Sequence, residues 1–190
     1  MKIVPEVRPL AAGMNIVLIG PRGSGKTSVS RRLAAVTGRG LLSTDLLVSY
    51  ESEGASIAAL VERHGGDWRP FRELEYQVVV KAAALEGIII DCGGGVVVDL
   101  DAAGEEIFSE RKVAALKRHG QLVWLKGDAG RLAARIRGDE SRPSLSRTND
   151  AETIMRRREP FYRLAADHVV EIDGCRIPEI VERVGTVLGL

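Results

Sequence analysis

The feature that most constrains this chain is an apolar segment, residues 15–19, that leads directly into the sequence GPRGSGKT at residues 20–27. This octapeptide has the pattern G-x-x-x-x-G-K-T, whose glycines let the backbone curl so that several N–H groups point at phosphate oxygens. A helix predicted from residue 25 onward adds the positive end of its dipole. The alternative is a glycine-rich turn with an incidental KT dipeptide, but strand, loop and helix occur in the order that the motif requires. The segment therefore predicts a site for a nucleoside triphosphate, with ATP as the expected ligand.

Two side chains of this loop carry the predicted chemistry. Lys26 is expected to reach the β- and γ-phosphates, and the hydroxyl of Thr27 is expected to bind the Mg²⁺ that bridges them. The other nucleotide contacts are expected from Gly20, Gly23, Ser24, Gly25 and Ser28.

Composition narrows the class of ligand. The chain has 190 residues and a formal net charge of +1, whereas a nucleic-acid-binding protein is more often basic overall. Its arginines gather instead in residues 131–147 and 156–163, which suits a small anionic ligand. We therefore expect a small-molecule acceptor and no nucleic-acid partner.

The cysteines and the apolar runs bear on location. Cys92 and Cys175 are far apart in sequence and match no metal-binding spacing, so we expect reduced thiols and no disulfide. Residues 1–13 lack the apolar core of a signal peptide, and no run is long enough to span a bilayer. The expectation is a cytoplasmic monomer without a membrane partner.

Short apolar runs rich in β-branched residues alternate with helical patterns along the chain. This alternation is typical of a parallel sheet that is covered by helices on both faces. The expected strands are residues 15–19, 40–44, 87–92, 121–125 and 168–172, and the expected helices are residues 25–36, 56–63, 71–85, 105–118, 129–136, 151–165 and 177–188. The predicted fold class is α/β: one domain over residues 1–190, with a three-layer, doubly wound, five-stranded parallel sheet.

Two polar segments are expected to form insertions over the carboxyl ends of the strands, where such sheets bind ligands. Residues 46–68 are polar with several glycines, and with the following residues to 74 they are assigned to an acceptor-binding insertion. Residues 138–149 are almost wholly polar and are assigned to a lid. A lid that closes over bound phosphate excludes water and protects the γ-phosphate from hydrolysis. Residues 1–13 are assigned to an N-terminal extension.

Five further motifs follow the phosphate loop: STD at residues 43–45, FRELE at 71–75, GGG at 93–95, RPSL at 142–145 and REPFY at 158–162. In this order they resemble the shikimate kinases of the nucleoside-monophosphate-kinase-like group of P-loop enzymes. The resemblance covers nearly everything after Met14. It implies a P-loop kinase that uses ATP and Mg²⁺ to phosphorylate the 3-hydroxyl of shikimate. The products are shikimate 3-phosphate and ADP, in a step toward chorismate and the aromatic amino acids.

Two arginines are candidates for binding the carboxylate of such an acceptor. A planar guanidinium binds a carboxylate through two hydrogen bonds, so Arg72 and Arg158 form the predicted clamp. Glu75, three residues after Arg72, is expected to hold that guanidinium in its rotamer. The alternatives are a surface ion pair for Arg72 and a solvated helix face for Arg158. Phe71 is expected in the same site, and Trp68 either lies beside it or packs under the insertion.

The three glycines and two further arginines complete the predicted site. Gly93, Gly94 and Gly95 follow a buried strand, where their N–H groups could bind substrate hydroxyls; a flexible turn is the alternative. Arg142, in the lid, is predicted to move onto the β- and γ-phosphates and offset the charge of the transition state. The resemblance implies that Arg135 stacks on adenine. Either arginine has the alternative of an ordinary surface position.

Two carboxylates are assigned to chemistry and metal binding. Asp45 is predicted to orient or deprotonate the attacking hydroxyl, with a helix N-cap as the alternative. Ser43 stands where the family pattern has an Asp associated with the Mg²⁺ hydration shell. Asp91 ends a short apolar strand, immediately before Cys92 and the glycines, and we predict that it supplies the missing charge. Its alternative is an N-cap or turn residue that points away from the metal.

These departures from the family pattern leave the acceptor open. Besides Ser43, the lid carries Ser144 in an apolar slot. One alternative function is a kinase for another small hydroxy acid, such as gluconate. Another is a catalytically silent nucleotide-binding relative that kept the fold.

Overall fold

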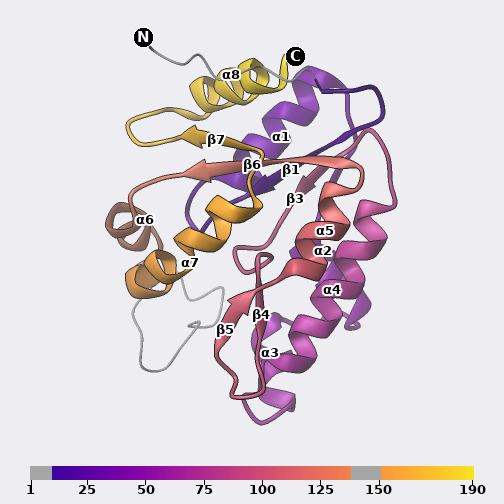
Figure 1. Cartoon of the computed structure of the whole chain (residues 1–190), viewed down its shortest axis with the longest axis vertical. Helices are drawn as coiled ribbons and strands as arrows, with labels where there is room; N and C mark the ends of the chain where they lie inside the picture. The colour runs from indigo at the N-terminus through magenta and orange to yellow at the C-terminus, as the bar shows by residue number, and fades with distance from the viewer. Residues whose placement is uncertain (1–9, 138–150) are drawn as a thin grey trace.

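The computed structural model describes residues 10–137 and 151–190, and its centre is a five-stranded parallel sheet with strand order β2-β3-β1-β6-β7 (Figure 1). The strands are β1 (Asn15–Ile19), β2 (Leu41–Ser43), β3 (Ile89–Asp91), β6 (Gly120–Lys126) and β7 (His168–Glu171). The central strand β1 is wholly buried, with neighbours on both sides. The predicted α/β class and its parallel sheet are thus confirmed.

Helices cover both faces of this sheet because side chains alternate along each strand. On one face, Ile16 and Leu18 of β1 pack in a core with α1 (Lys26–Thr37), α6 (Ala129–Ile136) and α8 (Ile177–Leu188). On the other face, Val17 and Ile19 pack with α4 (Arg69–Ala83), α5 (Glu110–Lys117) and α7 (Ala151–Ala165). The result is the three-layer arrangement of Figure 1.

The segment after β2 is more ordered than its polar sequence indicated. Strand β2 ends at Ser43, short of the predicted 40–44, because the helix α2 (Thr44–Glu51) begins at the next residue. We predicted no helix there. A second helix, α3 (Ile57–Arg63), starts after Ser56, whose side chain accepts a hydrogen bond from the Ala59 N–H. Both helices pack on α4 through a small separate core around Val48 and Phe71.

The helix predicted over residues 105–118 forms only over α5 (Glu110–Lys117), and its first residues are instead a strand. Strand β4 (Val98–Leu100) pairs antiparallel with β5 (Glu106–Phe108), and only then does α5 begin. The turn of this hairpin forms because the Asp101 carboxylate accepts the N–H groups of Ala103 and Glu105, while Gly104 adopts a φ of 85°. The two-stranded sheet lies beside α4, apart from the parallel sheet (Figure 1).

Two of our sequence assignments fall outside the described residues: the lid at 138–149 and the first nine residues of the N-terminal extension. Within the described ranges, no helix combines the length and apolar character that crossing a membrane requires.

Candidate active site

The phosphate loop joins β1 to α1 at the carboxyl edge of the sheet. Gly23 and Gly25 have φ angles of 81° and 83°, which residues with a side chain rarely adopt, so the curled backbone depends on glycine. The Lys26 ammonium donates to the carbonyls of Gly20 at 2.8 Å and Pro21 at 2.9 Å. A cavity of about 440 Å³ lies over this loop, and Lys26, Thr27 and Ser28 line it together with Arg135 from the end of α6.

The hydroxyl of Thr27 donates a hydrogen bond of 2.7 Å to the carboxylate of Asp91. Asp91 is the last residue of β3, and Ser43 is its register partner on β2. Asp91 is buried and lines the same cavity as Lys26. Asp91 is thus a strand residue, not an N-cap or turn residue, and its carboxylate faces the phosphate loop.

The Thr27 hydroxyl and the Asp91 carboxylate are the types of oxygen that bind Mg²⁺. Mg²⁺ in kinases is held by one or two protein oxygens together with phosphate oxygens. In the described part of the chain no cluster of three or more His, Cys, Asp or Glu could hold a metal by itself. A hydroxyl and a carboxylate in contact, beside a phosphate loop, fit an ion that the nucleotide brings with it.

A second cavity adjoins the first, and Asp45 and Arg22 line both. Asp45 lies in the first turn of α2 with Ser43 as the N-cap, so the N-cap alternative for Asp45 is wrong. Its carboxylate lies against Gly93, where an added Cβ would overlap Oδ1. The Gly93 N–H in turn donates to the Thr44 hydroxyl at 2.9 Å, which ties the start of α2 to the glycine segment.

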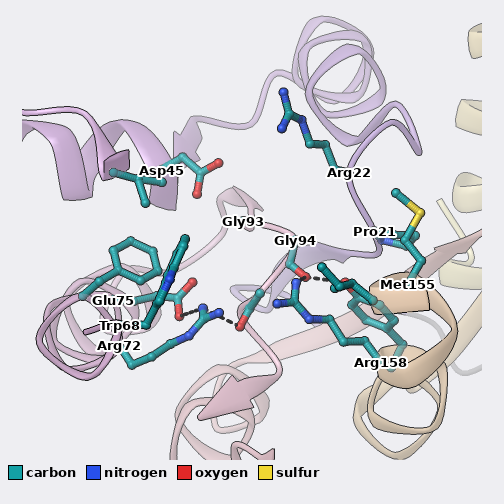
Figure 2. A pocket seen from close by; sticks show the side chains of 15 residues that line it. Pro21, Arg22, Asp45, Trp68, Arg72, Glu75, Gly93, Gly94, Met155 and Arg158 are labelled. Atoms are coloured by element: carbon teal, nitrogen blue, oxygen red, sulfur yellow. Dashed lines mark hydrogen bonds and ion pairs between the residues drawn. The ribbon is translucent and has the colours of Figure 1, made fainter. Parts of the chain in front are cut away.

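Figure 2 shows Arg72 and Arg158 extending into this second cavity from opposite sides. The Arg72 Nη1 donates to Glu75 Oε2 at 2.8 Å and to the Gly95 carbonyl at 3.1 Å, and its guanidinium lies 5.2 Å from the Phe71 ring centroid. Only 4% of Arg72 is exposed, so the alternative of a surface ion pair is wrong. Its Nε has no hydrogen-bond partner among the described residues. The guanidinium is thus fixed in place with a donor to spare.

Arg158, from α7, is equally buried, which excludes a solvated helix face. Its Nε lies 3.1 Å from Oε2 of Glu106, and its Nη1 lies 3.5 Å from the Gly94 carbonyl. The Tyr162 hydroxyl donates to the same carbonyl, and the Tyr162 ring stacks on the buried Trp124. Both alternatives for Trp68 hold: it lines the cavity in edge contact with Phe71, and it packs against the small core around Val48.

Sequence reasoning missed two charged residues behind the arginines, Glu106 and Lys112. Lys112 is fully buried in α5, and its ammonium lies 2.7 Å from the same Glu75 oxygen that Arg72 contacts. A signal for Lys112 existed, because Lys112, Val113 and Leu116 share the buried face of one helix. No comparable signal marked Glu106, which we had placed in a helix.

Burial and charge act in opposite directions on these groups. Burial would raise the pKa of Glu75, but Lys112 and Arg72 outweigh it and lower that pKa below 4.5, so the carboxylate is ionised. Burial lowers the pKa of Lys112, against the opposing pull of Glu75. Burial also raises the pKa of the Cys92 thiol well above its ordinary value, which keeps the thiol protonated. The polar groups behind the cavity therefore form a charge-paired support.

The predicted residues fall into three groups. One cavity is lined by Gly23, Gly25, Lys26, Thr27, Ser28, Asp91 and Arg135, whereas the predicted loop residues Gly20 and Ser24 do not line it. The other is lined by Asp45, Phe71, Arg72, Glu75, Arg158 and the three glycines. Arg142 and Ser144 lie outside the described residues.

Comparison with known proteins agrees with this geometry. The family described as Shikimate kinase matches residues 22–188. A shikimate kinase of Leptospira borgpetersenii serovar Hardjo-bovis is 41% identical over 170 residues, which cover 90% of this chain and 95% of that protein. One from Leptospira biflexa is 39% identical over 93% of this chain and 97% of its own length.

Solved structures show the same likeness. The structure described as shikimate kinase from Acinetobacter baumannii in complex with shikimate superposes with a TM-score of 0.78 at 26% identity, covering 93% of each chain. A gluconokinase from Sinorhizobium meliloti has a TM-score of 0.57 at 17% identity over 96% of this chain and 94% of its own, and shares the fold alone. The chain belongs to the shikimate kinase family.

Proposed function

We propose that this chain transfers the γ-phosphoryl group of ATP to the 3-hydroxyl of shikimate, giving shikimate 3-phosphate and ADP. One observation carries the proposal: Asp45 lies between a cavity over the phosphate loop and a cavity that contains two buried arginines. A small hydroxy acid bound to the arginines would present a hydroxyl to Asp45 on the side of the nucleotide. Phosphoryl transfer depends mainly on such positioning.

The acceptor carboxylate would bind between Arg72 and Arg158. Both arginines line this cavity, where a guanidinium can donate two parallel hydrogen bonds to a carboxylate. Gly93, Gly94 and Gly95 bring the backbone to the cavity wall, where N–H groups are proposed to bind acceptor hydroxyls. Phe71 would cover the apolar side of the acceptor ring.

On the nucleotide side, Lys26 would move from its loop carbonyls to the β- and γ-phosphates. The loop residues Gly20, Gly23, Ser24, Gly25 and Ser28 would contact the phosphates, and Arg135 would stack on the adenine. Arg142 would approach the transferring group as the lid at 138–149 closes. Asp45 would orient the attacking hydroxyl or accept its proton, which holds the nucleophile in line.

For the metal, we propose that Thr27 and Asp91 hold the Mg²⁺ that ATP carries, with Asp91 replacing the carboxylate lost at Ser43. The support is that Asp91 is the register partner of Ser43 and contacts Thr27. When bound, Mg²⁺ neutralises charge on the phosphate oxygens. On this proposal, the metal-binding carboxylate lies one strand away from Ser43 at the same edge of the sheet.

The metal proposal has its own test. Asp91→Asn retains an oxygen that can accept from Thr27 but removes the charge. In this variant, the gain in ATP affinity that Mg²⁺ provides should fall by about ten- to hundredfold, as measured by calorimetry. The affinity for ATP without metal should be unchanged. The double variant Ser43→Asp with Asp91→Ser should restore the dependence. If Asp91→Asn binds Mg²⁺-ATP as the native chain does, the proposal is wrong.

We further propose that residues 1–190 act as one kinase domain, with an acceptor-binding insertion at 46–74, a lid at 138–149 and an extension at 1–13. We also propose that it works as a cytoplasmic monomer, without nucleic acid or membrane.

The function is tested by a coupled ADP-release assay with Mg²⁺-ATP against shikimate, quinate and gluconate. We expect turnover with shikimate, and its loss in Asp45→Asn. Turnover with gluconate instead would assign a different hydroxy acid. Binding of ATP without turnover of any of the three would support a silent nucleotide-binding relative.

A further inference from the structure

We propose that Glu106, on the β4–β5 hairpin, is a positioning residue for acceptor binding because it orients Arg158. This inference rests on the proposed function, in which Arg158 holds the acceptor carboxylate. It assigns the hairpin, which lies outside the parallel sheet, to the acceptor site.

The side chains of Glu106 and Arg158 are in close contact and almost fully buried. Glu106 Oε1 and Oε2 lie 3.2 Å and 3.1 Å from the Arg158 Nε, and Oε1 also accepts from Nη2. The exposed fractions of the two side chains are 5% for Arg158 and 11% for Glu106. Arg157 contacts Oε2 from the solvent side at 2.9 Å. The carboxylate thus engages one whole edge of the Arg158 guanidinium.

The position of Glu106 relative to the cavity decides its role. Arg158 lines the acceptor cavity, whereas Glu106 does not. Glu106 therefore approaches the guanidinium from behind, on its Nε–Nη2 edge, and leaves Nη1 beside the Gly94 carbonyl. A guanidinium that is already oriented loses less side-chain entropy when a ligand carboxylate binds. This geometry indicates that Glu106 helps Arg158 to bind the acceptor carboxylate and does not compete with that carboxylate for Arg158.

The hairpin is anchored well enough to hold Glu106 still. Glu106 is paired with Leu100 across the two strands. At the base of the hairpin, the Ser109 hydroxyl donates to Asp99 Oδ2 at 2.7 Å, and Arg111 Nε donates to the same oxygen at 2.9 Å. These bonds join β4 to the start of α5, so the hairpin cannot swing without breaking a buried polar contact.

Charge supports the same assignment. Burial would raise the pKa of Glu106, but the hydrogen bond and charges of Arg158, together with the charge of Arg157, outweigh it and lower the pKa below 4.5. Glu106 is therefore ionised at neutral pH. Its charge compensates that of the buried Arg158 before the acceptor binds.

The test compares Glu106→Ala, Glu106→Gln and Glu105→Gln. Glu105 is the exposed neighbour on the same hairpin, so its variant makes the same charge change away from Arg158. We expect Glu106→Ala to raise the KM for shikimate about ten- to hundredfold and to leave the KM for ATP unchanged. Glu106→Gln, which keeps one hydrogen-bond acceptor, should fall in between, and Glu105→Gln should match the native chain.

A double-variant cycle separates positioning from a general structural role. If Glu106 acts through Arg158, then Glu106→Ala adds no further rise in KM once Arg158→Met is present. An equal rise in both backgrounds overturns the proposal, as does an unchanged KM. A lower KM for shikimate would show that Glu106 competes with the acceptor, which also overturns it. If Glu106→Ala does not fold, Glu106→Gln decides.

Failure of this inference is distinguishable from failure of the proposed function. A native chain that does not turn over shikimate contradicts the proposed function. A native chain that does so, with Glu106 variants indistinguishable from it, contradicts only the role of Glu106.

Discussion

Replacing Gly95 with alanine should weaken acceptor binding without altering nucleotide binding. Gly95 has no positive φ, so an alanine backbone is allowed there. The added Cβ would lie 2.5 Å from Arg72 Nη1 and 2.8 Å from Nη2. Since Gly95 does not touch the phosphate loop cavity, the change acts on one of the two arginines alone.

The size of the effect follows from the space around Arg72. Ordinary van der Waals contact begins at 3.4 Å, so the guanidinium must retreat by about 0.9 Å. The guanidinium has little room to move, because its Cζ lies 5.2 Å from the Phe71 ring centroid and 5.8 Å from that of Trp68. Glu75 also holds Nη1 by a hydrogen bond. A lost hydrogen bond between charged groups costs about 1.5–3 kcal/mol. The KM for shikimate should therefore rise about ten- to hundredfold.

Steady-state kinetics of ADP release, with each substrate varied in turn, would measure this change. Gly93→Ala is the matched comparison, because its Cβ would overlap the Asp45 carboxylate instead of Arg72. A displacement of about 1 Å in a reacting group lowers turnover by about a hundredfold, so Gly93→Ala should mainly reduce kcat. The two variants should thus separate binding from chemistry.

Two results would refute this reasoning. An unchanged KM for shikimate in Gly95→Ala would mean that Arg72 does not hold the acceptor. A rise in the KM for ATP of the same size would mean that the glycine segment acts on the whole site and not on Arg72.

Two further predictions concern stability. Lys112→Met leaves Glu75 with one fewer buried cation and should lower the free energy of unfolding by about 3–5 kcal/mol in urea titrations; a loss below about 1 kcal/mol would contradict the importance of this buried pair. The folded-state pKa of Glu106 lies below its ordinary 4.5, so its contribution to stability is fully present above pH 4.5 and is lost as the pH falls through the folded value. Thermal melts below pH 4.5 should accordingly fall less steeply for Glu106→Gln than for the native chain, and parallel slopes would contradict the lowered pKa.

The sequence was sufficient to predict those parts of the site whose residues are close together along the chain. The phosphate loop, the strand before it and the helix after it follow from residues 15–36 alone. The Arg72–Glu75 pair also follows from helical spacing, although its burial does not. The ends of the elements were predicted less well. Strand β2 is shorter than predicted because Thr44 begins a helix, which the polar composition of the following segment did not indicate.

The hairpin shows why some of the sequence analysis failed. Residues 105–118 contain enough helix-forming residues to predict one helix, yet Asp101 and Gly104 form a turn that pairs β5 with β4. Strand pairing depends on a partner segment, so a short strand carries little signal of its own.

Sequence patterns alone predicted the five strands of the parallel sheet and the phosphate-binding loop, and they marked Arg72 and Arg158 as candidates for acceptor binding, because these signals lie in short stretches of the chain. They did not predict α2 or the β4–β5 hairpin. Only the tertiary structure decided what supports those arginines. Glu106 meets Arg158 across 52 positions of sequence, and Lys112 meets Glu75 across 37. Such contacts arise from how α4, α5, α7 and the hairpin pack together, and periodicity within one element carries no information about the partner that another element will bring.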